Sequence, residues 1–162
     1  MQKQERILLD GLPLVSKKEK KKILLQLLYL YKRLSEQREP DADMKGIQLS
    51  DKLETTYSFS QQEKWEIKKV KAILLGKRGL YKQYLPIWFE LLSEHRVADR
   101  PELVIEDLIA IANHLRILGD QEKGISRYKE AYMLAKDNHF TILSNQCLSL
   151  LIDIFANSKQ YT

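Results

Sequence analysis

Cysteine, glycine and proline are all scarce in this 162-residue chain. The single cysteine, Cys147, excludes an internal disulfide framework and is typical of a protein from a reducing compartment. With only 6 glycines and 4 prolines, the chain has few of the turn signals that separate short strands. No segment has the enrichment in Val and Thr that strands show. These absences favour an all-α protein.

Long apolar runs are also missing. The longest stretches, such as 103–111, are interrupted by charge well before the roughly 18–20 residues that a membrane span needs. The first six residues lack the basic-then-apolar layout of a signal peptide. We therefore predict a cytoplasmic protein that does not enter a membrane. The apolar content of 44% is enough for the packed core of a single domain.

Apolar residues recur with a helical period along the whole chain. Ser16 with Glu19, and Ser60 with Glu63, have the spacing of capping boxes and mark two helix starts. Gly119 is the expected residue just beyond the end of a helix. Pro86 lies inside a helical stretch and predicts either a kink or a late start of that helix.

The segment 119–131, in which a Gly-Asp turn leads into an amphipathic helix, has weak internal copies. Gly79 aligns with Gly119 at an offset of 40, Ser158 aligns with it at an offset of 39, and the Lys-Gly-Ile triplet at 45–47 returns at 123–125. Helical hairpins that cannot bury their apolar faces alone form such arrays. We predict one repeat domain over 1–162, with a leading segment at 1–15. Its hairpins are expected at 16–57, 60–94, 101–137 and 139–162, the last cut off after its first helix.

Residues 105–137 resemble a tetratricopeptide repeat, and the match at 65–92 is partial. The positions that carry the resemblance are Leu108, Ile111, Ala112, Gly119, Asp120, Gly124, Tyr128 and Ala131. The resemblance implies a right-handed α-solenoid of three to four hairpins that binds an extended protein or peptide segment on its concave wall. The period near 39 is longer than the period of that family, which is roughly 34 residues, so longer helices or loops are expected.

Arrays with such enlarged periods are similar to the sensor halves of peptide-sensing transcriptional regulators of Gram-positive bacteria. A sensor and dimerisation part of such a regulator is therefore the alternative function. The apolar face of 139–157 would be partly uncovered, and a homodimer contact there would hide it.

Four residues of the best-matched repeat are expected to face the binding groove: Glu106, Ile109, Asn113 and Arg116. An Asn amide can donate to and accept from a peptide backbone at once, and Arg116 could pair with a carboxylate. The alternatives are that Asn113 is a solvated or locally bonded helix residue and that Arg116 is an ordinary surface side chain.

The run 17–22 holds five lysines in a first helical turn, where cations oppose the helix dipole. It could meet nucleic-acid phosphates, but it contains no aromatic side chain to stack on bases. A solvated helix start is the preferred interpretation, and nucleic acid is not the expected partner.

No pattern in the chain indicates catalysis or a cofactor. His95, His114, His139 and Cys147 are scattered over different segments without metal-ligand spacing. Tyr84 and Trp88 share a helix face, where packing is favoured over a ligand platform. We predict a non-catalytic, regulatory module that binds a protein or peptide and holds no metal or cofactor.

Overall fold

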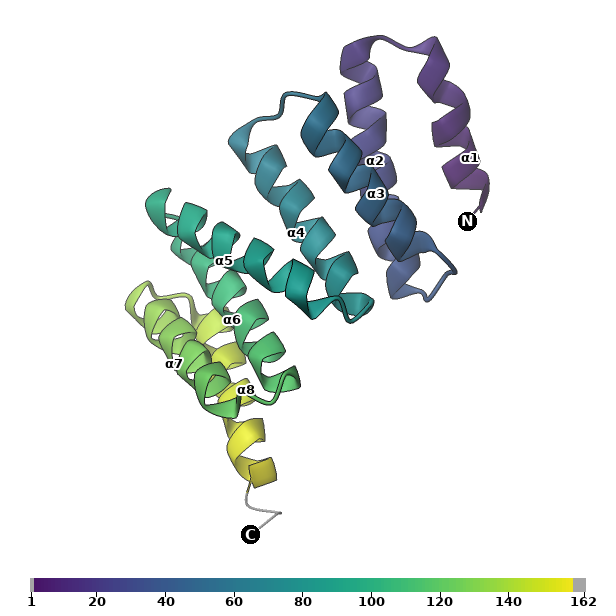
Figure 1. Cartoon of the computed structure of the whole chain (residues 1–162). Coiled ribbons are helices and arrows are strands. Elements are labelled where there is room, and N and C mark those ends of the chain that lie inside the picture. Colours follow the sequence, from purple (N-terminus) through teal and green to yellow (C-terminus); the bar gives the residue numbers. More distant parts are fainter. Residues whose placement is uncertain (1, 159–162) are drawn as a thin grey trace. The chain divides into compact units, whose positions relative to one another are not determined.

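The computed structural model describes residues 2–158, which form eight α-helices, one 3-10 helix and no strand (Figure 1). This confirms the all-α class and shows a helical repeat-like architecture. The helices are α1 (Gln2–Gly11), α2 (Lys17–Glu36), α3 (Ala42–Thr56), α4 (Gln61–Lys77), α5 (Tyr81–Val97), α6 (Pro101–Ile117), α7 (Gln121–Asp137) and α8 (Thr141–Ser158), with the 3-10 helix η1 (Leu12–Leu14) after α1. The end of the last predicted hairpin, 159–162, lies outside the described residues.

Both predicted capping boxes are present. The backbone N–H of Glu19 donates to Ser16 Oγ at 3.4 Å, and the N–H of Ser16 donates to Glu19 Oε2 at 3.0 Å. Ser60 and Glu63 make the same reciprocal pair at 3.3 and 2.8 Å. These bonds satisfy amide groups that have no partner within the helix, so they define where α2 and α4 begin.

The later helices recur with a regular spacing. From α4 onward they begin at positions 61, 81, 101, 121 and 141. The starts of α4, α5 and α6 therefore recur two helices later at an offset of 40, which agrees with the offset between Gly79 and Gly119. Pro86 lies inside α5, which starts before it, so the prediction of a late helix start is wrong.

Helix ends repeat the same backbone motif. After α6, the N–H of Gly119 donates to Arg116 O at 3.0 Å and the N–H of Asp120 donates to Leu115 O at 2.9 Å. This pair of bonds is a Schellman motif, and Gly119 has the positive φ of 89° that the motif needs. The same pair of bonds closes α2, α4, α5 and α7, with Arg38, Gly79, Asp99 and His139 in the left-handed conformation.

The chain divides into two compact units, Met1–Tyr84 and Leu85–Thr162. In the first unit α1 packs on α2, and α2, α3 and α4 pack on one another. Its most buried side chains include Leu28, Leu53, Ile67 and Leu74. The extent of the predicted single repeat domain stays a prediction.

Charged residues link the helices of the first unit. Glu5 Oε1 accepts from Lys45 Nζ at 2.8 Å and from the Tyr31 hydroxyl at 2.9 Å, which joins α1 to α2 and α3. The bond from Lys45 is the main reason that the pKa of Glu5 is lowered. Lys71 Nζ on α4 contacts two carboxylates of α3, Asp51 at 2.7 Å and Glu54 at 2.9 Å.

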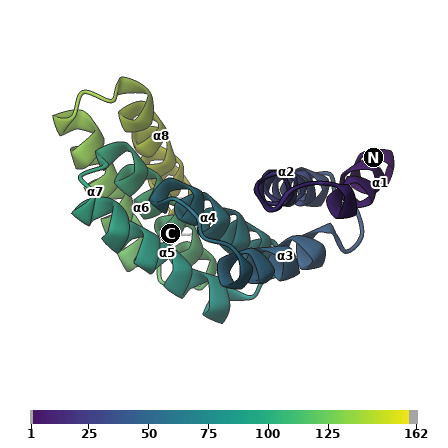
Figure 2. The ribbon, with the colours of Figure 1, turned by 90° about the horizontal axis from the view of Figure 1, so that it is seen from above.

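In the second unit α7 contacts both α6 and α8 (Figure 2). Gly124 permits the close approach of α7 to α6, because a Cβ built on it would lie 2.6 Å from Arg116 Cγ and 3.1 Å from the backbone oxygen of Ala112. Tyr128, Ala131 and Ala135 on α7 are fully buried. The absence of a side chain at Gly124 therefore sets how closely these two helices approach.

Candidate functional site

The four predicted groove residues all lie on α6, spaced by three or four positions and therefore on one face of the helix. Their exposure differs. Glu106 is exposed, Asn113 and Arg116 are half-buried, and Ile109 is only 8% exposed. Ile109 therefore offers a partner little contact area in this structure. The role of the four residues in binding stays a prediction.

Asn113 is held by a side chain of the neighbouring helix. The Tyr128 hydroxyl on α7 donates to Asn113 Oδ1 at 2.5 Å. Tyr128 is fully buried, so its ring fixes the position of the hydroxyl and, through it, the orientation of the amide. The two N–H donors of Asn113 take no part in that bond and are the groups that could meet an acceptor on a ligand.

Arg116 lies one helical turn beyond Asn113 and is positioned by the packing of α7. Its side-chain carbons approach the place that a Cβ on Gly124 would occupy, so the absence of a side chain at Gly124 gives Arg116 its room. Its Nε donates to Gln121 Oε1 at 3.4 Å. The amide of Asn113 and the guanidinium of Arg116 thus form a pair of adjacent donors, suited to a carbonyl and a carboxylate respectively.

A buried polar pair lies elsewhere in the second unit. His95 on α5 and Asp107 on α6 are 2% and 1% exposed, and His95 Nδ1 lies 2.6 Å from Asp107 Oδ2. A carboxylate can only accept, so with Asp107 ionised it is Nδ1 that carries the proton of this bond. The pair joins two consecutive helices through a bond that water cannot reach.

Sequence reasoning missed this pair, although the repeat register contains a signal for it. At an offset of 40, Asp107 corresponds to Ile67 and Cys147, and His95 corresponds to Thr55 and Ala135. Ile67, Cys147 and Ala135 are buried and Thr55 is exposed, so the signal is clear at Asp107. A polar residue at a position that is otherwise apolar in the repeat indicates a partnered core residue.

The side chain of His114, also on α6, makes a hydrogen bond within its own helix. Its Nδ1 donates to the backbone oxygen of Ala110 at 2.8 Å. Burial lowers the pKa of His114 from its usual 6.5 to about 4. The imidazole is therefore neutral in the folded protein at neutral pH.

In the basic run at 17–22, Lys21 makes contacts with other segments of the fold. Lys21 Nζ donates to Glu63 Oε2 at 2.9 Å and lies 4.4 Å from the centre of the Phe59 ring. The bond from Lys21 is the main reason that the pKa of Glu63 is lowered. One lysine of the run therefore joins α2 to α4, while three others are exposed: Lys17, Lys18 and Lys22.

Several other sequence interpretations can be compared with the structure. Tyr84 and Trp88 are buried, as expected for packing residues, and Cys147 is a buried core residue whose thiol pKa is raised by burial.

The described part of the chain contains no group of three or more acidic, histidine or cysteine side chains that could hold a metal. Between residues 2 and 158, no helix combines the length and the apolar character that crossing a membrane requires.

A surface groove of about 560 Å³ lies between α1 and α2. Its apolar lining includes Ile7, Leu8 and Leu30, and Arg33 lies at its side with Gln4 as hydrogen-bond partner at 3.1 Å. No pattern in the sequence predicts this groove, because α1 is short and precedes the detectable repeats.

The fold and these contacts define an all-α protein of helical repeat-like architecture. No protein-family model, curated protein or solved structure matches the chain.

Proposed function

We propose that this chain is a non-catalytic, cytoplasmic module of the tetratricopeptide type that binds a protein or peptide segment. In this proposal the hairpins form a right-handed solenoid, and the first helix of each hairpin lines its concave wall. The even spacing of the helix starts from α4 to α8 supports it, as do the repeated Schellman ends. An array of this kind offers an extended surface for an extended ligand.

The observation that carries the proposed site is the support of Asn113 by Tyr128 across the α6–α7 hairpin. A hydrogen bond from a fully buried tyrosine restricts the rotamers of Asn113 before any ligand arrives. Binding then costs less side-chain entropy, which is the advantage of a preorganised contact. In the proposed mechanism Asn113 donates to a backbone carbonyl of the ligand, and Arg116 pairs with an acidic side chain or a terminal carboxylate. Glu106 and Ile109 complete the same face.

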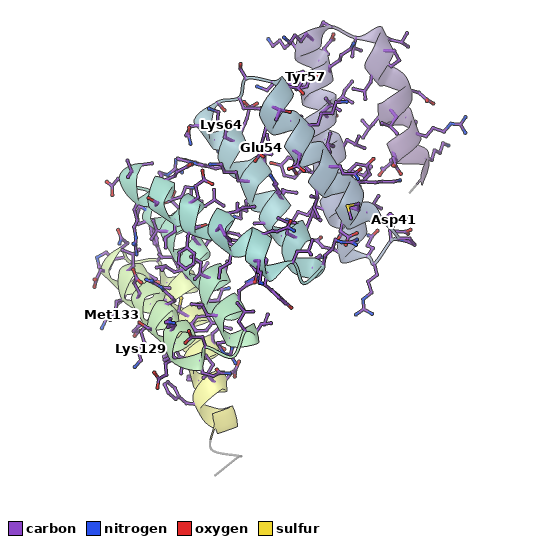
Figure 3. All side chains as sticks on the ribbon, viewed as in Figure 1. Asp41, Glu54, Tyr57, Lys64, Lys129 and Met133 are labelled. Carbon is purple, nitrogen blue, oxygen red and sulfur yellow. The ribbon has the colours of Figure 1, made fainter. Side chains whose placement is uncertain are left out.

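Selection from a random library of displayed 12-residue peptides, followed by titration of the enriched synthetic peptides, tests this site. We expect Asn113→Ala with Arg116→Ala to weaken binding at least tenfold, because two directed polar contacts are lost. The matched control is Lys129→Ala with Met133→Ala, two exposed residues that project from α7 (Figure 3). Equal affinities for the unmodified chain and the Asn113/Arg116 variant would refute the site.

The alternative function is the sensor and dimerisation part of a bacterial transcriptional regulator. It rests on analogy of fold, and one observation favours it: α8 has apolar side chains on its exposed surface. Binding of nucleic acid through 17–22 remains the less favoured proposal, because Lys21 is engaged by Glu63 and Phe59.

A further inference from the structure

The groove between α1 and α2 is formed by two helices that pack side by side in the first unit (Figure 1). We call it the α1–α2 groove. Each of its walls is one face of a helix, because residues three or four positions apart share a face. The lining includes Gln4, Ile7 and Leu8 on α1, and Tyr29, Leu30 and Arg33 on α2.

The apolar surface of the α1–α2 groove suits a third helix. Ile7 and Tyr29 line it from opposite walls and are 61% and 44% exposed. Two adjacent helices leave a furrow between them, and the side chains at positions i, i+3, i+4 and i+7 of an amphipathic helix fill such a furrow. Nucleic acid fits this groove poorly, because its binding depends on neutralising phosphates and gains little from an apolar lining.

The charge of α2 indicates that the partner is acidic. This helix has seven basic and two acidic residues, so its net charge of +5 equals that of the whole chain. Lys18, Lys22 and Arg33 lie within an arc of about 60° around α2, and the same arc contains Tyr29 of the groove wall. Positive charge therefore continues the groove face of α2 towards both ends of the helix.

These three cations lack the carboxylate partner that a neighbouring lysine has. Lys21, on another side of α2, contacts Glu63 of α4 at 2.9 Å. In contrast, a terminal nitrogen of Arg33 donates to the neutral Oε1 of Gln4 at 3.1 Å, which leaves its charge uncompensated. Within residues 2–158, none of the three cations forms a salt bridge with a carboxylate.

The carboxylates next to this face are already bonded within the fold. Glu19 belongs to the capping box of α2, and Glu66 of α4 accepts from the Tyr29 hydroxyl at 3.4 Å. Glu36 lies 3.8 Å from the Nζ of Lys32. The fold thus provides partners for these carboxylates and leaves the three cations to a ligand of opposite charge.

We propose that the α1–α2 groove binds an acidic amphipathic helix of another protein. The apolar side chains of that helix contact Ile7 and Tyr29, and Asp or Glu residues near its two ends pair with Arg33 and with the two lysines. Lys18 and Arg33 are roughly 22 Å apart along α2, which is the length of a helix of about 15 residues. The site uses no residue of α6, so this proposal and the peptide site on α6 can fail independently.

Selection from a displayed library of 16-residue helical peptides, with the full chain as bait, tests the charge of the partner. The library has an alanine background, Leu, Ile, Phe or Met at the i, i+3, i+4 and i+7 positions, and Glu, Gln or Lys at the flanking positions. We expect enrichment of Glu over both Gln and Lys at the flanks. Enrichment of Lys, equal recovery of all three, or no enrichment at all would overturn the proposal.

Titration of the enriched synthetic peptide tests the role of the cations. We expect Lys22→Glu with Arg33→Glu to weaken binding by about tenfold or more, because two attractive pairs become repulsive. The matched control is Lys52→Glu with Lys64→Glu, which changes the net charge equally at two exposed lysines of α3 and α4. An equal loss of affinity in the control would show a general charge effect and overturn the site.

A second pair of variants tests the apolar wall. Ile7→Asp should weaken binding about tenfold, because it places a carboxylate in the apolar part of the groove against an acidic ligand. Leu9→Asp is the matched control: Leu9 is 43% exposed on the same helix but lies about 160° around it from Ile7. Circular dichroism should show the same helix content in both variants, and Ile7→Gln gives a milder test if it does not. Equal affinities for the Ile7 variants and the unmodified chain would refute the site.

Two further measurements distinguish this site from the alternatives. Asn113→Ala with Arg116→Ala should leave binding of the acidic peptide unchanged, and a loss there would place the peptide on α6 instead. A 20-base-pair DNA duplex should bind more weakly than the peptide. Tighter binding of the duplex that depends on Lys22 and Arg33 but not on Ile7 would overturn the proposal in favour of a nucleic-acid surface.

Discussion

His95 and Asp107 show how a single polar pair can specify the packing of two helices. Both side chains are almost completely buried, at positions that correspond to Ala135, Ile67 and Cys147 in the repeat. Burying either group alone would be costly, but together they form a hydrogen bond of 2.6 Å between Nδ1 and Oδ2. A shift of α5 along α6 would break this bond, so the pair favours one register of the two helices.

A double-mutant cycle tests this role. Asp107→Ala removes the acceptor of the His95 bond and should lower the free energy of unfolding by about 2–3 kcal/mol. His95→Ala should have a similar cost. The combination His95→Ala with Asp107→Ile reproduces apolar residue types found at the corresponding positions, so it should cost at least ~1 kcal/mol less than the sum of the single changes.

The measurement is urea unfolding followed by circular dichroism. Lys129→Ala and Met133→Ala form the control pair, since both are exposed, and their effects should add within ~0.5 kcal/mol. Additive costs at His95 and Asp107 would show that the two side chains act independently.

At the scale of the element, helix ends share one geometry but not one residue type. Gly79 and Gly119 have positive φ without steric cost, whereas Arg38, Asp99 and His139 adopt φ values of 51–60° with a Cβ present. The Schellman bonds hold all five residues in this conformation. Three helix ends therefore store a small amount of backbone strain.

Glycine substitution should release that strain. Asp99→Gly and His139→Gly are each expected to raise the free energy of unfolding by about 0.5–1 kcal/mol, while Gly119→Ala should lower it by about 1 kcal/mol. The control is Lys136→Gly, in the last turn of α7, which should lower stability by up to about 1 kcal/mol because glycine weakens a helix. Chemical denaturation measures all four. Loss of stability in Asp99→Gly and His139→Gly would contradict a strained helix end.

For the whole molecule, the burial of His114 makes stability depend on pH. The pKa of His114 is lowered from 6.5 to about 4 in the folded chain, so the unfolded chain binds a proton more readily. Above pH 6.5 the ring is neutral in both the folded and the unfolded chain, and the free energy of unfolding is highest. As the pH falls from 6.5 towards 4, the unfolded chain takes up the proton first and the free energy of unfolding decreases. Because the ring is only half-buried, we expect a loss on the order of 1 kcal/mol over this range.

The comparison with His114→Gln isolates this contribution, because glutamine does not titrate. Thermal unfolding at pH 7.5, 6.5, 5.5 and 4.5 should show a smaller decrease for the variant than for the unmodified chain. Glu5 and Glu63, whose pKa values are lowered, destabilise both proteins equally at the acid end. Parallel pH profiles would exclude a role for His114.

Much of the local structure could be predicted because it depends on neighbouring residues. Ser16 with Glu19 and Ser60 with Glu63 form capping boxes from side chains three positions apart. Gly119 ends α6 because it tolerates positive φ. The positive φ at Asp99 and His139 has a weaker sequence signal, because Asp and His adopt that conformation less readily than glycine does.

The candidate site was predictable only in part. Helical spacing is enough to place Asn113 and Arg116 on one face of α6. The bond from Tyr128 to Asn113, and the burial of Ile109, depend on how α7 packs on α6. The groove between α1 and α2 likewise requires the position of a helix that lies outside the detectable repeat.

The amino-acid pattern along the chain is enough to predict the all-α class and most helix boundaries, and it indicates a period close to the one that the helix starts show. These properties follow from periodicity, caps and turn residues, which act over a few positions along the chain. The packing of the helices on one another brings His95 against Asp107, lets Tyr128 orient Asn113, and leaves Leu148 and Ile152 of α8 exposed. Each of these depends on contact between helices, and such contacts are set by the packing of whole faces rather than by any local pattern.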